Sequence, residues 1–144
     1  METVPTEMKI RIEVSRRSFI KRRVDRTIDF VSPIPSPFNY GSVFGRMAPD
    51  GDPEDAVVLG ARIRENVTVS MPVWGRIKFV DASLPDHKWV CGPQQPTENE
   101  WAFLERFFWV YARAKRLMYR IRGTTGIVEY RGLERFSVED SLSR

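Results

Sequence analysis

Four acidic side chains crowd into six consecutive positions of the sequence: Asp50, Asp52, Glu54 and Asp55. Hard divalent cations such as Mg²⁺ bind oxygen ligands, usually a few carboxylates together with water and substrate phosphate. Gly51 permits a sharp turn and Pro53 fixes its own φ, so neighbouring carboxylates can be held converging. Like charges this close repel one another, and a cation would relieve that repulsion. The segment therefore predicts a site for a divalent cation.

Two other interpretations of this acidic segment compete with the metal site. A solvated acidic turn would have the same composition. A calcium loop of the EF-hand type fits less well, because it needs oxygens at alternating positions and a distal Glu that the segment lacks. A second carboxylate pair favours the metal site, since Asp81 and Asp86 follow the run at residues 76–80 and Lys88 comes two residues later.

These residues resemble the soluble family of inorganic pyrophosphatases. That family has an Asp-Gly-Asp-Pro-x-Asp segment entering a strand and, downstream, two aspartates separated by four residues with a lysine two positions further on. This sequence has both motifs, at residues 50–55 and 81–88. Residues 24–26 look like the family's Val-Asp-Arg, residues 32–41 are similar to its Ser-Pro…Tyr-Pro-x-Asn-Tyr-Gly stretch, and residues 107–111 are similar to its Phe-Phe-x-x-Tyr. The motif order is preserved.

The resemblance implies a reaction and a role for each matching residue. The implied reaction is Mg²⁺-dependent hydrolysis of inorganic pyrophosphate to two phosphates, with Mn²⁺ as a possible substitute for Mg²⁺. Paired metals can activate a water and brace both the attacking and the leaving oxygen. The match makes Asp52 the base that takes a proton from that water, and it places Tyr40 beside the nucleophile. Four aspartates are implied as metal ligands: Asp50, Asp55, Asp81 and Asp86. Three residues are implied to contact phosphate oxygens: Arg26, Lys88 and Tyr111.

Structural roles compete with three of these assignments. Tyr111 lies on the apolar face of a predicted helix, where an aromatic side chain is more often part of the core. Lys88 could be a lysine at a strand edge, and Tyr40 could be a packing residue of a proline-rich loop. The residues taken without the resemblance favour these structural roles.

The chain also departs from the family pattern in the residues that would bind phosphate. Ala112 stands where the family has a lysine, and Ser36 stands where it has a tyrosine. Ser18 and Ile20 fall where the family has Lys-x-Glu. Three long basic side chains could reach the phosphate instead: Lys21, Arg22 and Lys115. The alternative function is a non-catalytic or re-specialised relative that binds metal and another phosphorylated ligand.

The elements that must position these residues are mostly short strands. Alternating or β-branched runs predict strands at residues 9–14, 24–31, 56–59, 67–73, 76–80, 88–91 and 127–130. Residues 32–41 hold three prolines and are expected to be extended, irregular and stiff. The pattern predicts a single domain, residues 1–144, which is mainly β with α: a small five-stranded OB-like β-barrel with one long helix packed on it.

The predicted helix has clear signals at both ends. Thr97 and Glu100 form a capping box at its start, and Gly123 is a natural stop. One apolar row at helical spacing holds Trp101, Leu104, Phe108 and Tyr111. A second row, expected to widen the same face, holds Phe103, Phe107, Val110, Ala114 and Leu117.

Composition limits the class of partner and the compartment. The net charge of +4 and pI of about 9.5 suit a polyanion, either a small phosphorylated molecule or nucleic acid. An OB-type nucleic-acid module is therefore an alternative, but the acidic cluster would repel a phosphate backbone unless metals neutralised it. Cys91 and His87 are each alone, which excludes a disulfide framework and a multi-histidine zinc site. No apolar run is long enough for a membrane span and no secretory segment stands at the start, so the expected location is the cytoplasm. The resemblance implies a homo-oligomer.

Overall fold

The structure of this chain, a computed structural model, describes residues 4–18, 20–22, 28–31 and 35–136. Its elements follow in chain order: β1 (Glu7–Val14), β2 (Ile20–Arg22), β3 (Ile28–Val31), β4 (Asn39–Met47), β5 (Pro53–Val58), β6 (Thr68–Asp81), β7 (Leu84–Pro85), β8 (Lys88–Cys91), α1 (Glu98–Arg122) and β9 (Glu129–Arg135). Within these residues, no helix combines the length and the apolarity needed to cross a membrane.

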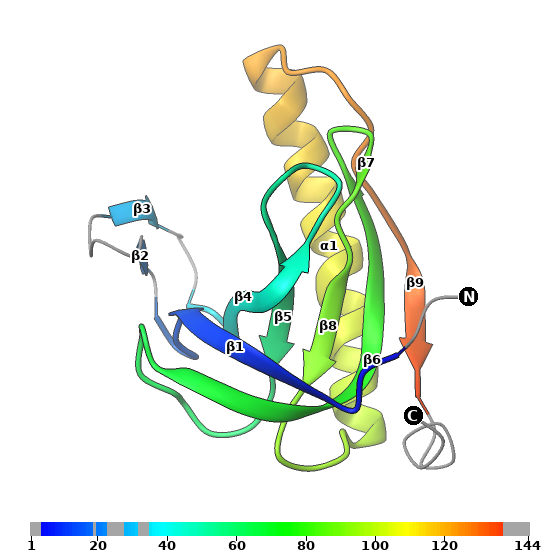
Figure 1. Cartoon of the computed structure of the whole chain (residues 1–144). Helices are drawn as coiled ribbons and strands as arrows, with labels where there is room; N and C mark the ends of the chain where they lie inside the picture. The colour runs from blue at the N-terminus through cyan, green and yellow to red at the C-terminus, as the bar shows by residue number, and fades with distance from the viewer. Residues whose placement is uncertain (1–3, 19, 23–27, 32–34, 137–144) are drawn as a thin grey trace.

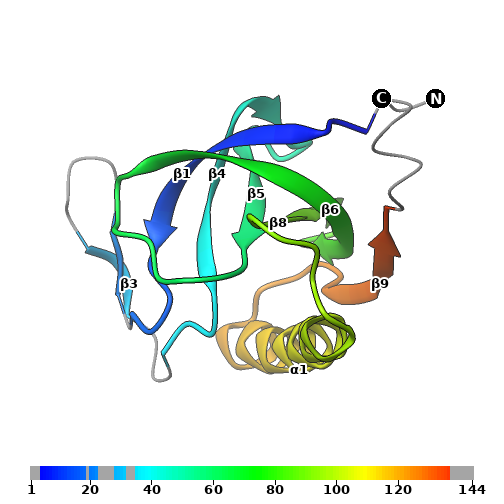
Figure 2. The ribbon, with the colours of Figure 1, turned by 90° about the horizontal axis from the view of Figure 1, so that it is seen from below.

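Five strands close into a barrel with α1 along one side (Figures 1 and 2). Their order is β1-β4-β5-β8-β6, and the pairing of β1 with β6 completes the ring. β5 and β8 run parallel, while the other neighbours run antiparallel. β7 and β9 pair with β6 outside this ring, and β2 pairs with β3 in a separate two-stranded sheet. The predicted fold, a mainly-β five-stranded barrel with one long helix, is confirmed.

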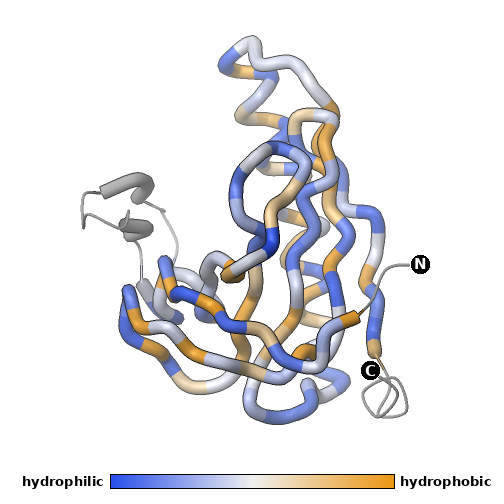
Figure 3. The backbone as a smooth tube through the Cα atoms, viewed as in Figure 1, coloured by the Kyte–Doolittle hydropathy of each residue, from blue (hydrophilic) through white to orange (hydrophobic). Residues whose placement is uncertain are grey.

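Strands β5 and β8 are buried on both faces, as parallel neighbours in the middle of a sheet usually are. Successive side chains of a strand point to opposite faces, so each of these strands serves two cores. Ala56, Val58, Trp89 and Cys91 belong to the core inside the barrel. Val57 and Val90 belong to the core between the barrel and the helix. In β1, by contrast, buried and more exposed residues alternate, and apolar and polar residues interleave along the tube in Figure 3.

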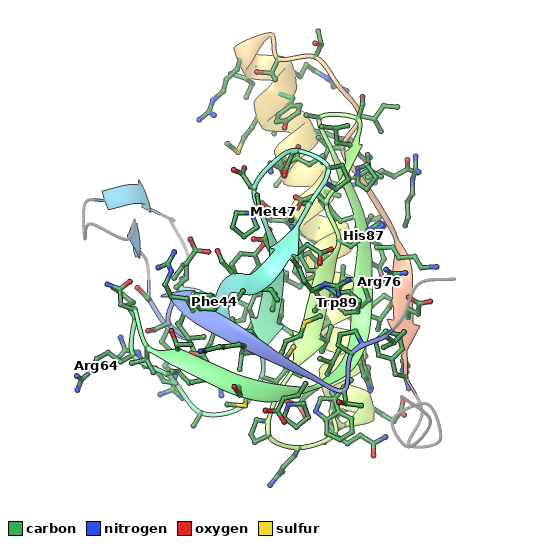
Figure 4. All side chains as sticks on the ribbon, viewed as in Figure 1. Phe44, Met47, Arg64, Arg76, His87 and Trp89 are labelled. Carbon is green, nitrogen blue, oxygen red and sulfur yellow. The ribbon has the colours of Figure 1, made fainter. Side chains whose placement is uncertain are left out.

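The barrel interior also holds a large aromatic ring. Trp89 is almost wholly buried, and the guanidinium groups of Arg46 and Arg76 lie over its ring at 5.0 and 5.4 Å from the centroid. Arg76 and Trp89 lie side by side in Figure 4. These cations stack on an aromatic face, so two of the many basic residues have a packing role.

Strand β6 is one element of 14 residues, whereas the sequence predicted two strands, at residues 67–73 and 76–80. The break in the alternation falls at Gly75, next to a register shift between Val73 and Gly75. A Cβ at Gly75 would lie 2.4 Å from the carbonyl oxygen of Glu134 and 2.7 Å from the ring of Trp101, so only glycine fits. The first half of β6 pairs with β1 and the second half with β8 and β9. Glycine therefore bends this strand and does not end it.

Two other strand predictions need correction, and a third lies partly outside the described residues. Residues 39–41 were expected in an irregular segment, but they begin β4, because the buried side chain of Asn39 satisfies neighbouring backbone groups. Its amide nitrogen donates to the carbonyls of Val58 and Ala61 at 3.2 and 2.9 Å, and its oxygen accepts from the N–H of Ile63 at 2.9 Å. β9 spans Glu129–Arg135 and runs further than the predicted 127–130, because it pairs with β6. Of the predicted strand 24–31, the structure describes residues 28–31 as β3.

The helix begins and ends where its capping residues predicted. The Thr97 hydroxyl accepts a hydrogen bond from the Glu100 N–H at 3.1 Å, and the Glu100 carboxylate accepts one from the Thr97 N–H at 3.0 Å. Gly123 ends the helix in the left-handed conformation. The helix buries four residues against the barrel: Trp101, Leu104, Phe108 and Ala112. Of the second predicted row, Phe107 packs against this core, but Phe103, Val110 and Leu117 are exposed, so the row widens the buried face only at Phe107.

Candidate functional site

The five predicted aspartates are carried by two features of the fold. Asp50, Asp52 and Asp55 belong to the β4–β5 hairpin, while Asp81 ends β6 and Asp86 directly follows β7. In Figure 1 this hairpin and the β6–β7 turn extend in the same direction, towards the upper half of helix α1. Residues from both the barrel and the helix can therefore contribute to one site.

Lys88 lies at the centre of the strand-borne part of the site. It stands opposite Asp55 in the parallel pairing of β5 with β8, and it is 3% exposed. Its Nζ lies 2.9 Å from an oxygen of Asp86 and 3.2 Å from an oxygen of Asp55. Burial alone would lower the pKa of Lys88, but the carboxylates of Asp55 and Asp86 outweigh burial and raise it. Lys88 is therefore a fixed positive charge, and we call these three residues the strand cluster.

Two aromatic rings border the strand cluster. The Lys88 Nζ lies 5.9 Å from the ring centroid of Tyr40 and 5.6 Å from that of Phe79. Burial, followed by the negative charge of Asp55, raises the pKa of the Tyr40 hydroxyl well above 10. Tyr40 is therefore a neutral hydrogen-bond donor beside the carboxylates.

Asp81 forms its hydrogen bonds with the helix, and Lys88 of the strand cluster adds an electrostatic contribution that also lowers the pKa of Asp81. The Lys115 ammonium pairs with its Oδ2, and the Tyr119 hydroxyl donates to its Oδ1. Burial alone would raise the pKa of Asp81, but the hydrogen bonds from Lys115 and Tyr119 outweigh it and lower the pKa. Burial would lower the pKa of Lys115, yet Tyr111 and Asp81 raise it. We call Asp81, Lys115 and Tyr119 the helix cluster.

Tyr111 lies beside the helix cluster, one turn before Lys115. Its ring lies 5.6 Å from the ring of Phe79, and the Lys115 Nζ lies 5.5 Å from its centroid. Tyr111, Lys115 and Tyr119 follow one another at four-residue intervals, which places them on one face of the helix. That spacing is the sequence signal for Tyr119, which the motif comparison missed.

Asp50 and Asp52 lie at the exposed tip of the β4–β5 hairpin. Gly51, at φ +89°, turns the chain, and the Asp52 N–H donates to Asp50 Oδ1 at 2.9 Å. Among the described residues, no group of three His, Cys, Asp or Glu side chains lies close enough together to hold a metal ion. The structure thus brings Asp55 and Asp86 together, and leaves Asp50 and Asp81 apart from them. The predicted phosphate-binding residue Arg26 lies outside the described residues.

The positions where the sequence departs from the family pattern have structural roles. Ala112 is fully buried between helix and barrel, and Lys115 supplies an ammonium that faces Tyr111. The Ser36 hydroxyl donates to the Phe38 carbonyl at 2.6 Å. The Ser18 hydroxyl lies 3.4 Å from a carboxylate oxygen of Glu65. Of the three basic residues expected as substitutes, Lys115 reaches the predicted site residue Asp81, and the side chains of Lys21 and Arg22 lie outside the described part of the structure.

Comparison with known proteins identifies similar sequences and similar folds. The family model described as inorganic pyrophosphatase matches residues 1–118. An inorganic pyrophosphatase of Gluconobacter oxydans (strain 621H) is 31% identical over 108 residues, covering 69% of this chain and 62% of that protein. One from Buchnera aphidicola subsp. Schizaphis graminum (strain Sg) is 31% identical over 107 residues, covering 68% and 59%. The chain therefore spans about three fifths of these curated relatives.

Solved structures show the same fold over nearly the whole chain. The inorganic pyrophosphatase of Helicobacter pylori matches with a TM-score of 0.72 and 22% identity, covering 99% of this chain and 94% of that chain. The inorganic pyrophosphatase of Thermus thermophilus matches with a TM-score of 0.74 and 22% identity, covering 99% and 89%.

Proposed function

Because the chain belongs to the inorganic pyrophosphatase family, we propose that it is a hydrolase that cleaves inorganic pyrophosphate to two phosphates with Mg²⁺ as its cofactor. The observation that carries the proposal is the strand cluster, in which a buried ammonium lies between two carboxylates. A cation fixed in this way suits a phosphate oxygen, and the adjoining carboxylates suit a metal ion that accompanies the phosphate.

The residues present fit a magnesium ion. Asp55 and Asp86 both lie within hydrogen-bond distance of one atom, Lys88 Nζ, so their oxygens converge. Mg²⁺ usually binds through one or two protein carboxylates, keeps several waters and takes substrate phosphates as further ligands. A pair of converging aspartates is therefore a sufficient protein contribution. Asp50 and Asp81 are proposed as further ligands, and Mn²⁺ would suit the same oxygens.

The chain's own residues would bind and orient the substrate. Lys115 lies over the ring of Tyr111, and Lys88 lies over the ring of Phe79, which contacts Tyr111, so both ammonium groups can bind phosphate oxygens near Tyr111. Tyr40, held neutral, can donate a hydrogen bond to the attacking water or to a phosphate oxygen. Arg26 and Tyr111 are proposed as further phosphate contacts. When bound, divalent cations supply an acidified water and stabilise negative charge on the leaving phosphate.

Asp52 is proposed as the residue that accepts the proton. It is exposed at the hairpin tip, and its backbone holds the side chain of Asp50. No basic side chain is paired with Asp52 within the described residues, so its carboxylate is available to a water. With Asp52 as the base, Asp55 and Asp86 can keep their ion pairs with Lys88.

A second function is favoured by the helix cluster. Lys115 and Tyr119 already satisfy Asp81, and Ala112 and Ser36 replace two family side chains that would bind phosphate. A relative that binds metal and another phosphorylated ligand, with little or no pyrophosphate turnover, would fit these substitutions. This alternative shares the strand cluster with the first proposal.

Phosphate release distinguishes the two functions. Purified protein is assayed with pyrophosphate, with and without Mg²⁺, beside a panel of nucleoside diphosphates and triphosphates. The proposal expects Mg²⁺-dependent release that is fastest with pyrophosphate. Faster release from a nucleotide, or binding of pyrophosphate without release, would support the re-specialised relative. The cytoplasmic location, the homo-oligomer and the single domain remain predictions.

A further inference from the structure

The two strands of the β4–β5 hairpin pair irregularly below the tip that carries the proposed base. The register shifts between Ser42 and Met47, so residues 43–46 of β4 lie opposite Glu54 alone. Gly45 lies in this stretch and has φ +75°, which takes the chain out of the extended conformation. A bulge of this kind interrupts the ladder of backbone hydrogen bonds. The backbone pairing alone therefore supports the hairpin poorly at this point.

Side chains join the two strands where the ladder is interrupted. Arg46 Nε on β4 donates to Glu54 Oε1 on β5 at 2.5 Å, and the two side chains are 32% and 19% exposed. The indole Nε1 of Trp89 on β8 lies 3.4 Å from the same oxygen of Glu54. The Arg46 guanidinium also lies over the Trp89 ring, 5.0 Å from its centroid. Each of these three residues contacts the other two, and we call them the hairpin clamp.

The hairpin clamp and the strand cluster lie on opposite faces of the same two strands. Glu54 and Asp55 are consecutive on β5, so their side chains point to opposite faces of the sheet. Lys88 and Trp89 are consecutive on β8 and do the same. Trp89 is 1% exposed in the barrel core, so it is a fixed support for the Arg46 side chain. The clamp therefore attaches the hairpin to the strands that carry the strand cluster.

We propose that the hairpin clamp positions the tip of the β4–β5 hairpin and so sets where the Asp52 carboxylate lies relative to the strand cluster. This inference rests on the proposed function, in which Asp52 accepts the proton. Hydrogen bonds within the tip hold it together: the Ala48 N–H donates to the Asp52 carbonyl at 2.8 Å, and the Gly51 N–H donates to the Ala48 carbonyl at 3.0 Å. The strands below the tip, joined by Arg46 and Glu54, set its direction. Arg46 and Glu54 are thus positioning residues that act through Asp52.

Positioning of this kind acts on the rate of the chemical step. A misplacement of about 1 Å can lower a rate by about 10²-fold. A general base is effective only within hydrogen-bond reach of the proton that it removes. Lys88, in contrast, is held by the register of β5 and β8, so phosphate binding should depend little on the clamp. Loss of the clamp should therefore lower kcat and leave KM nearly unchanged.

Arg76 offers a matched comparison with Arg46. Its guanidinium also lies over the Trp89 ring, 5.4 Å from the centroid, and it pairs with Glu134 at 3.0 Å (Figure 4). Arg76 lies on β6 and Glu134 on β9, so this ion pair does not join the strands of the hairpin. If Arg46 served only to pack on Trp89, removing either guanidinium would have the same effect. A role in positioning the tip belongs to Arg46 alone of these two arginines.

The test compares Arg46→Met with Arg76→Met in the full chain. Each variant keeps an apolar side chain beside Trp89 and loses one guanidinium. For Arg46→Met, initial rates at saturating Mg²⁺ should give a kcat lower than that of wild type by about tenfold or more, with the KM for pyrophosphate changed by less than about twofold. Arg76→Met should keep kcat within about twofold of wild type. Arg46→Lys, which keeps a cation beside Glu54, should recover part of the loss in kcat.

Hydrogen exchange follows the hairpin tip independently of activity. The amides of Ala48 and Gly51 should exchange several-fold faster in Arg46→Met than in wild type, because their hydrogen bonds open more often when the strands below them separate. Exchange at the tip should be unchanged in Arg76→Met. Mass spectrometry of peptides that cover residues 46–54 measures the exchange. Circular dichroism confirms that each variant folds.

Two results would overturn the proposal. The first is exchange at the tip that is the same in Arg46→Met and wild type. The second is a kcat that is the same in Arg46→Met and Arg76→Met, which would leave the clamp a role in packing only. If Arg46→Met does not fold, Glu54→Gln takes its place, because it removes the same ion pair and keeps the shape of the side chain.

Failure of the proposed function gives a different result. Wild-type protein that releases no phosphate from pyrophosphate in the presence of Mg²⁺ would refute the proposed function, and with it the effect of the clamp on kcat. The exchange measurement would still decide whether Arg46 holds the hairpin tip in place.

Discussion

The strand cluster and the helix cluster each pair a lysine with aspartate in an ion pair, but different elements position the two lysines. Lys88 is held by the parallel pairing of β5 with β8, and its side chain is 4% exposed. Lys115 lies on α1 and pairs with Asp81 at the end of β6, and the Lys115 side chain is 25% exposed. The strand cluster has two carboxylates for one ammonium, whereas the helix cluster has one carboxylate, one ammonium and one hydroxyl.

Because of this difference, we expect the strand cluster to affect the free energy of unfolding and the helix cluster to affect the affinity for substrate. The strand cluster has an excess negative charge near the core, so it can accept a cation, and its lysine is needed to keep two carboxylates together in a metal-free protein. The helix cluster is balanced and partly exposed, so its ion pair adds little to folding stability. Changes to the strand cluster should therefore alter stability and turnover together, and changes to the helix cluster should mainly alter substrate affinity.

The largest expected effect comes from a residue in neither cluster. Asp52→Asn should lower the rate of pyrophosphate hydrolysis by ~10²–10⁴-fold, because asparagine cannot accept a proton at neutral pH. Stability and Mg²⁺ binding should change little, because Asp52 is exposed and is not a proposed ligand. Initial rates at saturating Mg²⁺, with calorimetry for metal binding, check this.

The matched control is Asp55→Asn, the same substitution at an aspartate of the strand cluster. It should weaken Mg²⁺ binding and turnover together. If Asp52→Asn keeps most of the wild-type rate at saturating Mg²⁺, the base is another residue. A residue of the strand cluster or the helix cluster would then have to accept the proton.

The next effect is on stability. Lys88→Met should lower the free energy of unfolding by about 3 kcal/mol, because Asp55 and Asp86 are left facing each other without a cation. Excess Mg²⁺ should restore part of this loss, since a ligand at 100 times its dissociation constant adds about 2.7 kcal/mol. Urea unfolding with Mg²⁺ and with EDTA measures both quantities.

Cys91 provides a second measurement for the same variant. Burial raises the pKa of its thiol to about 12, so it should not react with a thiol reagent in the folded wild type at pH 8. Lys88→Met should make Cys91 more reactive, because both residues lie on β8. If Lys88→Met and wild type had the same free energy of unfolding and the same Cys91 reactivity, the strand cluster would not contribute more to stability than the helix cluster.

The strand cluster was predictable from sequence only in part. Asp86 and Lys88 are two residues apart, and alternation along an extended chain puts such residues on one face. Asp55 comes from another strand, and its position opposite Lys88 depends on the parallel register of β5 and β8, which no local pattern encodes. The motif comparison supplied that link. It did not indicate that Lys88 would occupy the space between the two aspartates.

The limits of prediction in the fold have the same cause. The helix was predictable at both ends because Thr97 and Gly123 act within one turn of the chain. The unbroken course of β6 was not, because Gly75 is required by contacts with Trp101 and Glu134, which lie far away in the sequence. The exposure of Phe103 and Leu117 could not be predicted from the sequence either. Helical spacing shows that residues share a face of the helix, but it does not show whether another element covers that face.

A smaller effect is expected for the helix cluster. Lys115→Met should raise the KM for pyrophosphate about tenfold with a smaller change in kcat, because it removes one positive charge that binds phosphate. The free energy of unfolding should fall by at most about 1 kcal/mol, because the ion pair with Asp81 is partly exposed. Rates over a range of pyrophosphate concentrations separate KM from kcat. Lys115→Arg keeps the charge and is the control; a loss of stability as large as that of Lys88→Met would contradict the comparison.

The smallest effect is expected for Tyr119→Phe, which removes one hydroxyl and leaves the charges in place. The Tyr119 hydroxyl donates to Asp81 Oδ1 while Lys115 pairs with Oδ2, so the variant keeps the ion pair and loses only the second hydrogen bond. One such bond contributes about 0.5–1.5 kcal/mol, and exposure places the expected loss of stability at the lower end.

The effect of Tyr119→Phe on catalysis depends on what the hydroxyl does for Asp81. If it only keeps Asp81 directed towards Lys115, its removal should change the KM for pyrophosphate by about twofold, well within the effect of one hydrogen bond. Freed from one of its two partners, Asp81 should also bind Mg²⁺ slightly better, which calorimetry can detect. Weaker Mg²⁺ binding in Tyr119→Phe would show instead that the hydroxyl orients Asp81 towards the metal, and the helix cluster would then belong to the metal site.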